Sequence, residues 1–139
     1  MRSPSMRHLL TVGLLAGLTT SAVVASAPDE KPTSLAEAGA AVEANQRTPE
    51  GKAYGTQLVK EFAQKGILRR CSEAAERDPS STWVLLKLDK DGVVKEVLLN
   101  PMTKMGTCAR NILLKERFSP PPKPDYWIGV YMKSSPYSR

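Results

Sequence analysis

Two short apolar runs separated by a polar turn dominate the hydrophobic pattern of this chain. The runs cover residues 83–88 and 93–99, and Asp89-Lys90-Asp91-Gly92 lies between them. Both runs are rich in Val and Leu, and Asp and Gly tolerate the left-handed backbone angles that a tight turn between antiparallel strands requires. The pattern therefore predicts a β-hairpin.

The apolar positions of the hairpin predict one buried face. Alternation places Val84, Leu86 and Leu88 on the same face of the first strand. The apolar positions of the second strand join this face only if that strand contains one extra residue, a β-bulge, near Lys95 and Glu96. Because a lone hairpin is marginally stable in water, helices are expected to cover this face. The expected core consists of Val84, Leu86, Leu88, Val94, Val97, Leu99, Ile112, Phe118, Ile128 and Val130.

Helical periodicity is present on both sides of the hairpin. Thr48 and Pro49 form a helix start, and apolar residues at helical spacing continue to residue 77, with Val59 and Leu68 assigned to the buried side. Gly66 either ends this helix or interrupts it. A second helix is expected from about residue 104 to residue 117, where a proline-rich segment ends it.

A last strand is expected at residues 127–132, which alternate between apolar and other side chains. This alternation places Ile128, Val130 and Met132 toward the core and Trp127 and Tyr131 on the opposite face. The order helix, strand, strand, helix, strand predicts a small α+β domain with a three-stranded sheet.

The first 27 residues have the pattern of a secretory signal peptide. Arg2 and Arg7 precede an uncharged run, and Ala25-Ser26-Ala27 fits a signal-peptidase site. An uncleaved membrane anchor is the alternative. With cleavage near Ala27, the export machinery engages the signal and the product is periplasmic or secreted. The expected division is a signal peptide at 1–27, a flexible Ala/Glu/Pro-rich tether or loosely docked helix at 28–47, the α+β domain at 48–133 and a polar tail at 134–139.

Charge narrows the classes of partner. After cleavage the chain carries 14 acidic residues and four more basic ones, since 20 Lys and Arg less Arg2 and Arg7 remain. These charges alternate in sign along the sequence instead of forming a basic cluster, so nucleic-acid binding is not expected.

The two cysteines, Cys71 and Cys108, lie on the inward stripes of the helices before and after the hairpin. Two cysteines in an exported chain are expected to form a disulfide. The alternatives are a redox or catalytic thiol, activated by neighbours such as Arg69 and Arg70, and a pair of free buried thiols.

Candidate catalytic and metal sites are few. His8 is the one histidine and lies in the signal segment, so the mature chain lacks Ser-His, Cys-His and His-metal sites. The turn at Asp89 and Asp91 does not continue as a calcium loop, because Val93, Val94 and Asn100 occupy the later ligand positions. We expect a protein that is not an enzyme and that binds no metal or cofactor.

Several motifs, taken in order, resemble a known family. Cys71-Ser72-Glu73-Ala74-Ala75 precedes a proline and the hairpin with its D-x-D-G turn. A strand reading V-x-x-V-x-L follows, then a helix with Cys108 near its start, then Arg117-Phe118-Ser119-Pro120-Pro121. Over about residues 56–132 this order resembles the TonB C-terminal-like domain. It is most similar to the two-cysteine type at the C-terminus of the gliding-motility proteins AgmX and PglI.

The resemblance implies an N-terminal helix followed by β-β-α-β, with helices packed on an antiparallel three-stranded sheet. It further implies a non-enzymatic protein-binding domain of a diderm bacterium. Such a domain acts by adding a partner's strand to its sheet, or as an accessory subunit of an envelope complex. The partner is then an envelope or secreted protein. The spacer of about twenty residues is too short for energy transduction between two membranes. A secreted binder or inhibitor of an extracellular enzyme, and a small hydrolase, are the alternatives.

The last strand provides the candidate binding edge, made of Trp127, Gly129, Tyr131 and Lys133. Two alternatives would close this surface: the N-terminal helix covers it, or the edge pairs with itself in a homodimer. Four aromatic and apolar side chains are expected on the face of the sheet opposite to the core: Trp83, Leu85, Trp127 and Tyr131. Either the N-terminal helix covers them, or they form an exposed apolar patch for a partner.

Overall fold

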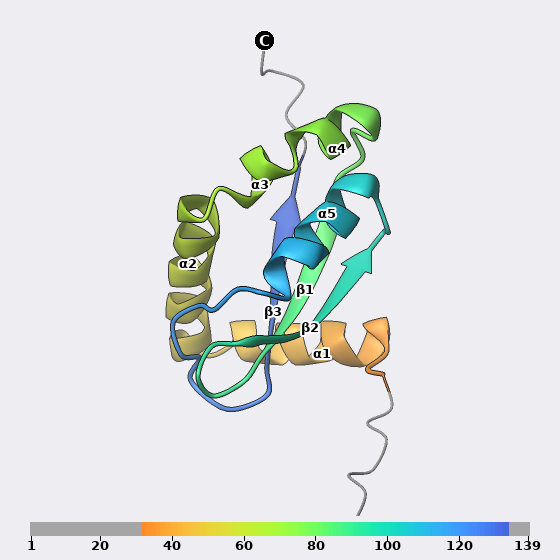
Figure 1. The fold of residues 1–139 in the computed structure, drawn as a ribbon. Helices are drawn as coiled ribbons and strands as arrows, with labels where there is room; N and C mark the ends of the chain where they lie inside the picture. Colours follow the sequence, from red (N-terminus) through yellow and green to blue (C-terminus); the bar gives the residue numbers. More distant parts are fainter. Residues whose placement is uncertain (1–31, 134–139) are drawn as a thin grey trace, which may run out of the picture. The chain divides into compact units, whose positions relative to one another are not determined.

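The hairpin strands β1 (Thr82–Leu88) and β2 (Val94–Asn100) form an antiparallel sheet with β3 (Tyr126–Met132), in the order β2-β1-β3 (Figure 1). The structure, a computed structural model, describes residues 32–133, which belong to one unit of the chain. The α+β architecture and the three-stranded antiparallel sheet agree with the prediction from the sequence. The predicted signal peptide at 1–27 and the tail at 134–139 lie outside the described residues.

The predicted β-bulge is present in β2. Lys87 pairs with Glu96 and Leu88 pairs with Val94, so Lys95 is the extra residue. The bulge returns the apolar side chains of β2 to the face that β1 buries, as the hydrophobic pattern requires. At the turn, the side chain of Asp89 accepts hydrogen bonds from the backbone N–H groups of residues 91 and 93.

Four helices lie on the core face of the sheet or at its upper end: α2 (Pro49–Gln64), α3 (Ile67–Arg70), α4 (Ser72–Arg77) and α5 (Lys104–Leu113) (Figure 1). Gly66 interrupts the helix predicted over residues 48–77, and its positive φ of 64° is a conformation that glycine adopts without strain. Nine of the ten predicted core residues are buried, and the tenth, Ile112, is partly buried against them.

The helix after the hairpin ends at Leu113 instead of Arg117. Phe118 donates its backbone N–H to the Gly92 carbonyl and Arg117 forms a β-bridge with Val93, so this segment pairs beside the hairpin instead of continuing the helix. Gly92 cannot carry a side chain here, because a Cβ atom would lie 1.9 Å from the Phe118 carbonyl oxygen.

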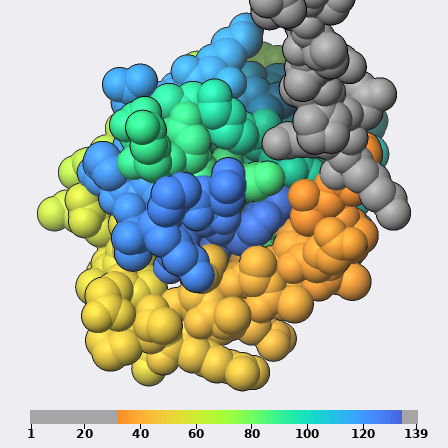
Figure 2. All heavy atoms as spheres, turned by 90° about the horizontal axis from the view of Figure 1, so that it is seen from below, coloured from red at the N-terminus to blue at the C-terminus, as the bar shows by residue number. Residues whose placement is uncertain are grey.

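Residues 35–46 decide between the two alternatives for this segment, because they form a docked helix instead of a flexible tether. They form α1 (Leu35–Gln46), which lies across the face of the sheet opposite to α5 (Figure 1). Ala38 and Val42 are buried against Leu85 and Trp127. The alanine-rich surface buries little area, but its small side chains let the helix approach the sheet closely. Seen from below, α1 and α2 form one side of the molecule beside the sheet (Figure 2).

Side-chain hydrogen bonds hold both ends of α1 on the sheet. The N–H and hydroxyl groups of Thr33 donate to the Glu96 carboxylate on β2, at 3.2 and 3.1 Å. At the other end, the side-chain amide of Asn45 donates to the Trp127 carbonyl on β3, at 2.9 Å. The helix therefore crosses the sheet from one outer strand to the other.

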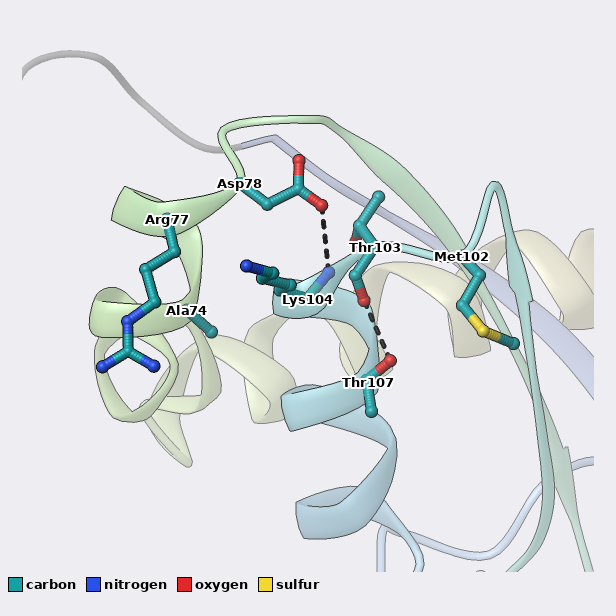
Figure 3. Close-up of a pocket in the computed structure, with 7 residues that line it drawn as sticks. All are labelled: Ala74, Arg77, Asp78, Met102, Thr103, Lys104 and Thr107. Atoms are coloured by element: carbon teal, nitrogen blue, oxygen red, sulfur yellow. Dashed lines mark hydrogen bonds between the residues drawn. The ribbon is translucent and has the colours of Figure 1, made fainter.

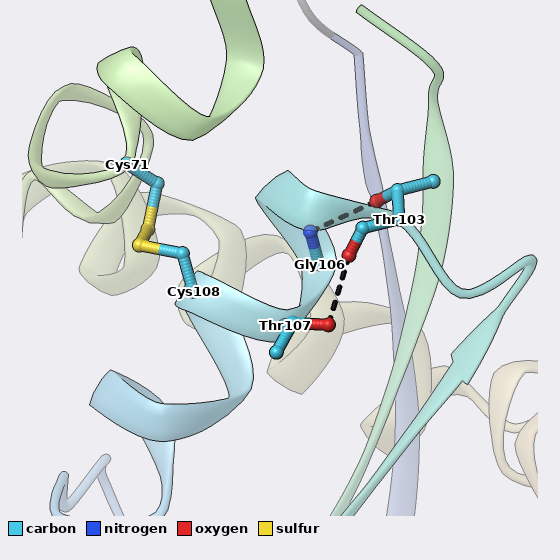
Figure 4. Close-up of a disulfide and its surroundings, with 5 residues drawn as sticks. All are labelled: Cys71, Thr103, Gly106, Thr107 and Cys108. Carbon is cyan, nitrogen blue, oxygen red and sulfur yellow. Dashed lines mark hydrogen bonds between the residues drawn. A yellow bond between two sulfur atoms is a disulfide. The ribbon is translucent and has the colours of Figure 1, made fainter. Parts of the chain in front are cut away.

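A disulfide between Cys71 and Cys108 joins the α3–α4 junction to α5, with the two Cα atoms 5.8 Å apart (Figure 4). This confirms the predicted pair, and no free cysteine is present in residues 32–133. Next to it, the Thr103 side chain caps α5 by accepting the Gly106 N–H (Figure 4). In the same part of the chain, no helix is long and apolar enough to cross a membrane.

Candidate functional site: the free edge of β3

The outer edge of β3 presents unpaired backbone groups. Leu86 pairs with Ile128 and Val84 with Val130 on the inner side of β3. At the hairpin end, the N–H of Asp89 bonds to the Val93 carbonyl and therefore points to the β2 side. Because backbone groups alternate along a strand, the odd-numbered residues of β1 direct their N–H and C=O groups to β2, and the even-numbered residues direct theirs to β3. The odd-numbered residues of β3 therefore direct their N–H and C=O groups away from the sheet.

The Asn45 contact with the Trp127 carbonyl agrees with this orientation and covers the first outward group. Beyond it, Gly129 and Tyr131 make no backbone–backbone hydrogen bond outside the ladder to β1 within residues 32–133. The outer edge of β2 is engaged in a similar way at its start, where Val94 donates its N–H to the Glu116 carbonyl. Either edge could accept an added strand through its backbone groups, so the side chains beside each edge distinguish them.

A groove of about 380 Å³ lies along this edge, between β3 and the helical segment from Val59 to Arg69. Val130, Tyr131 and Met132 all line it. Since consecutive side chains of a strand point to opposite faces, a cavity that touches three of them in a row lies along the strand's edge. The helical wall is mainly apolar and includes Val59 and Phe62. We call this cavity the β3 groove.

Exposed apolar side chains gather around the β3 groove. Val59 is 51% exposed, Leu68 47% and Tyr131 52%, and all three line the cavity. Trp83, which is 46% exposed, packs against Tyr131 with ring centroids 5.1 Å apart. Three of the seven large exposed hydrophobic side chains in the described residues therefore line this groove, and a fourth packs against one of them, which is the composition expected of a binding surface.

The structure divides the predicted edge residues into two groups. Trp127 is buried under α1, so it cannot meet a partner unless α1 moves. Gly129 is half-buried, and a Cβ atom there would lie 3.4 Å from Val42 of α1. Tyr131 and Lys133 are exposed. The N-terminal helix thus covers one half of this face, and the Trp83–Tyr131 pair remains open in the other half.

Three groove residues differ from the sequence prediction or lie outside it. Val59 and Leu68, which the helical spacing predicts on the buried side of their helix, are both exposed. A signal is present for Leu68, because adjacent helical residues point about 100° apart and Ile67 already points into the core. The sequence identifies Arg69 only as a neighbour of Cys71, and nothing in a single sequence places it beside β3.

The loop before β3 is fastened to α2 through Ser119. Its backbone N–H and hydroxyl both donate to the Glu61 carboxylate, and its carbonyl accepts from the Tyr54 hydroxyl at 2.7 Å. Burial raises the pKa of Tyr54, so this hydroxyl stays protonated and donates. With every polar group of Ser119 engaged, these contacts hold the loop before β3 against α2.

A second cavity, of about 470 Å³, lies where α4 ends and α5 begins (Figure 3). Its charged lining consists of Arg77, Asp78 and Lys104. Asp78 accepts the backbone N–H of Lys104 at 3.1 Å and thereby occupies the position at the start of α5 where an anion would bind (Figure 3). Hydrogen bonds from Ser80 and Lys104 lower the pKa of Asp78, so it is ionised at neutral pH.

Residues 32–133 contain no group of three or more His, Cys, Asp or Glu side chains placed to hold a metal ion. Comparison of the chain with models of known protein families, with curated proteins and with solved structures found no match in any of them.

Proposed function

We propose that the chain is a non-enzymatic, exported protein-binding domain, TonB C-terminal-like in fold, whose β3 edge accepts an extended segment of an envelope or secreted protein. The observation that carries this proposal is the outer edge of β3, where Gly129 and Tyr131 present backbone groups next to the β3 groove. An added strand would gain backbone hydrogen bonds from the edge and side-chain contacts from the groove.

Three further observations support the proposal. The disulfide is typical of proteins that leave the cytoplasm, and the N-terminal sequence has the signal-peptide pattern. The order of the sequence motifs around the hairpin resembles that of the TonB C-terminal-like domain. The Trp83–Tyr131 pair lies beside the same edge and offers aromatic contact to a bound segment.

The test first selects displayed random nonapeptides on the immobilised protein. The affinity of the enriched peptides is then measured for two variants. Gly129→Pro removes an outward N–H, whereas Gly129→Ala keeps it. Both variants add a Cβ atom at the position that lies 3.3 Å from Leu85, so the alanine variant controls for packing. We expect Gly129→Pro to weaken peptide binding about fivefold or more, which corresponds to the loss of one hydrogen bond.

Circular dichroism and thermal unfolding would first establish that the proline variant folds. If a folded Gly129→Pro protein binds the enriched peptides as tightly as Gly129→Ala, the β3 edge is not the binding surface and the proposal fails. Failure to enrich any peptide would count against it equally.

A further inference from the structure

Among the described residues, the lining of the β3 groove contains a single charged side chain, and its charge is positive. This residue, Arg69, follows the turn that separates α2 from α3, and no acidic side chain of residues 32–133 lines the cavity. The guanidinium of Arg69 lies over Gly66, 3.1 Å from the position that a Cβ atom would take there. It therefore lies beside the α2–α3 turn, and both Gly66 and Arg69 line the groove.

Arg69 has no ionic partner within residues 32–133, which distinguishes it from its neighbours. Arg70, the next residue, pairs with Glu116 at 3.4 Å, and Lys65 pairs with the same carboxylate at 3.1 Å. A second cation, Lys133, comes directly after Met132 at the end of β3 and is exposed. The groove thus combines an apolar wall with an uncompensated positive charge, and an acidic group would complement it.

We propose that the β3 groove selects extended peptide segments in which an aliphatic and an acidic side chain stand two positions apart. This inference rests on the proposed function, since it assumes that a strand adds to β3. Side chains two positions apart in a strand point to the same side. The aliphatic one would lie against Val59, Phe62 and Leu68, and the acidic one would meet the guanidinium of Arg69.

The residue between these two points to the other face of the sheet. There it would lie beside Tyr131 and the Trp83 ring that packs on it. The aromatic pair can accept many apolar side chains, so it adds affinity with little selectivity. Selectivity for charge therefore rests on Arg69, which binds carboxylates through a planar fork of donors.

The experiment selects phage-displayed random nonapeptides on three immobilised proteins: the wild type, Arg69→Gln and Arg70→Gln. The peptides are fused to the coat protein through their C-termini, so that no free carboxylate is displayed. We expect the wild type and Arg70→Gln to enrich Asp or Glu two positions from Val, Ile or Leu. The Arg69→Gln protein should still enrich aliphatic peptides but lose the preference for acid. Arg70→Gln is the matched control, because that arginine is not part of the groove lining and pairs with Glu116.

Synthetic versions of an enriched peptide, blocked at both ends, give the quantitative arm. Replacing its acidic residue by the matching amide should weaken binding to the wild type about two- to fivefold, the range for an exposed ion pair. The same replacement should leave binding to Arg69→Gln unchanged. Equal loss in both proteins, or no acidic preference in the selection, would overturn the inference.

The failure of this inference can be told apart from the failure of the proposed function. Peptides that bind through the edge, shown by their loss in Gly129→Pro, but without acidic preference, would overturn the inference alone. If instead a second copy occupies the groove, sedimentation will show a dimer that Gly129→Pro dissociates and the selection will enrich nothing, which overturns both. The peptide selection and the sedimentation measurement therefore distinguish failure of this inference alone from failure of the proposed function.

Discussion

Neighbouring residues of β1 lie in two different environments. Leu86 is fully buried between the sheet and the helices of the core face. Leu85 points the other way and is 8% exposed, with Ala38 and Val42 of α1 as its cover. The alternation of a strand thus places one leucine in a dense core and the next under a thin helical layer.

Truncation of the two leucines should show this difference. Leu86→Ala should reduce the free energy of unfolding by about 2–5 kcal/mol, the usual cost of a large-to-small change in a core. Leu85→Ala should cost about half as much, because α1 can settle toward the space that is left. Urea unfolding of both variants measures these losses. A loss at Leu85 equal to that at Leu86 would show that α1 packs as tightly as the core helices.

Glu116 connects three segments, two through its charged carboxylate and one through its backbone carbonyl. Its carboxylate meets Lys65 at the end of α2 and Arg70 in α3, and its backbone carbonyl accepts the Val94 N–H of β2. The hydrogen bond from Lys65, together with the charge of Lys65 and the contact with Arg70, holds the pKa of Glu116 below its ordinary value of 4.5. The ionised form is therefore bound more tightly in the folded protein than in the unfolded chain.

This lowered pKa fixes the sign of a pH effect. The stabilisation from Glu116 is complete above its unfolded pKa and is lost as the pH falls through the lower folded pKa. We expect Glu116→Gln to be about 1 kcal/mol less stable than the wild type at pH 7, with the difference shrinking as the pH falls below the ordinary pKa of 4.5. Urea unfolding across this range tests it. Curves that stay parallel to low pH would mean that the charge of Glu116 does not contribute.

At the scale of elements, local signals explain what the sequence predicts well. The hairpin, its bulge and the disulfide-bearing helices follow from alternation, turn residues and helical spacing, all of which act over a few neighbouring positions. The docking of α1 does not, because its surface is nearly all alanine and depends on Asn45 and Thr33 meeting β3 and β2. The early end of α5 likewise depends on Phe118 pairing with the turn at Gly92.

The sequence predicts only part of the candidate site, because only part of it depends on local signals. Strand alternation identifies Tyr131 as facing away from the core, whereas the burial of Trp127 depends on α1, which lies far away in the sequence. The helical wall of the groove depends on the break at Gly66, after which Leu68 and Arg69 turn toward β3. Such a change of direction requires the tertiary arrangement and cannot be read from helical periodicity.

The disulfide should be a major source of stability for the helical layer. It closes a loop with a sequence separation of 37 residues that contains the whole hairpin. A variant with Cys71→Ala and Cys108→Ala should lose about 4 kcal/mol of unfolding free energy in the chain-entropy description. Urea unfolding of the oxidised wild type, the reduced wild type and the double variant measures it. A double variant as stable as the oxidised protein would contradict this role.

For the molecule as a whole, the two faces of the sheet are unequally protected, and its two outer edges differ in the side chains beside them. The core face lies under α2, α3 and α5, and the other face is covered by α1 over only part of its area. At the edges, residues 116–118 pair beside the start of β2, while β3 keeps its outward groups beyond Trp127 free of backbone partners within residues 32–133. The exposed apolar side chains concentrate at this second edge.

Amide hydrogen exchange of Gly129 and Tyr131, followed by NMR with and without a selected peptide, tests strand addition at β3 most directly. The N–H groups of both residues point away from β1, whereas that of Val130 points to the ladder. Peptide binding should slow exchange at residues 129 and 131 about tenfold or more and leave Val130 little changed, a period-two response that strand addition alone produces. Slowed exchange at the α4–α5 cavity or at β2, with Gly129 and Tyr131 unaffected, would contradict peptide binding at the β3 edge.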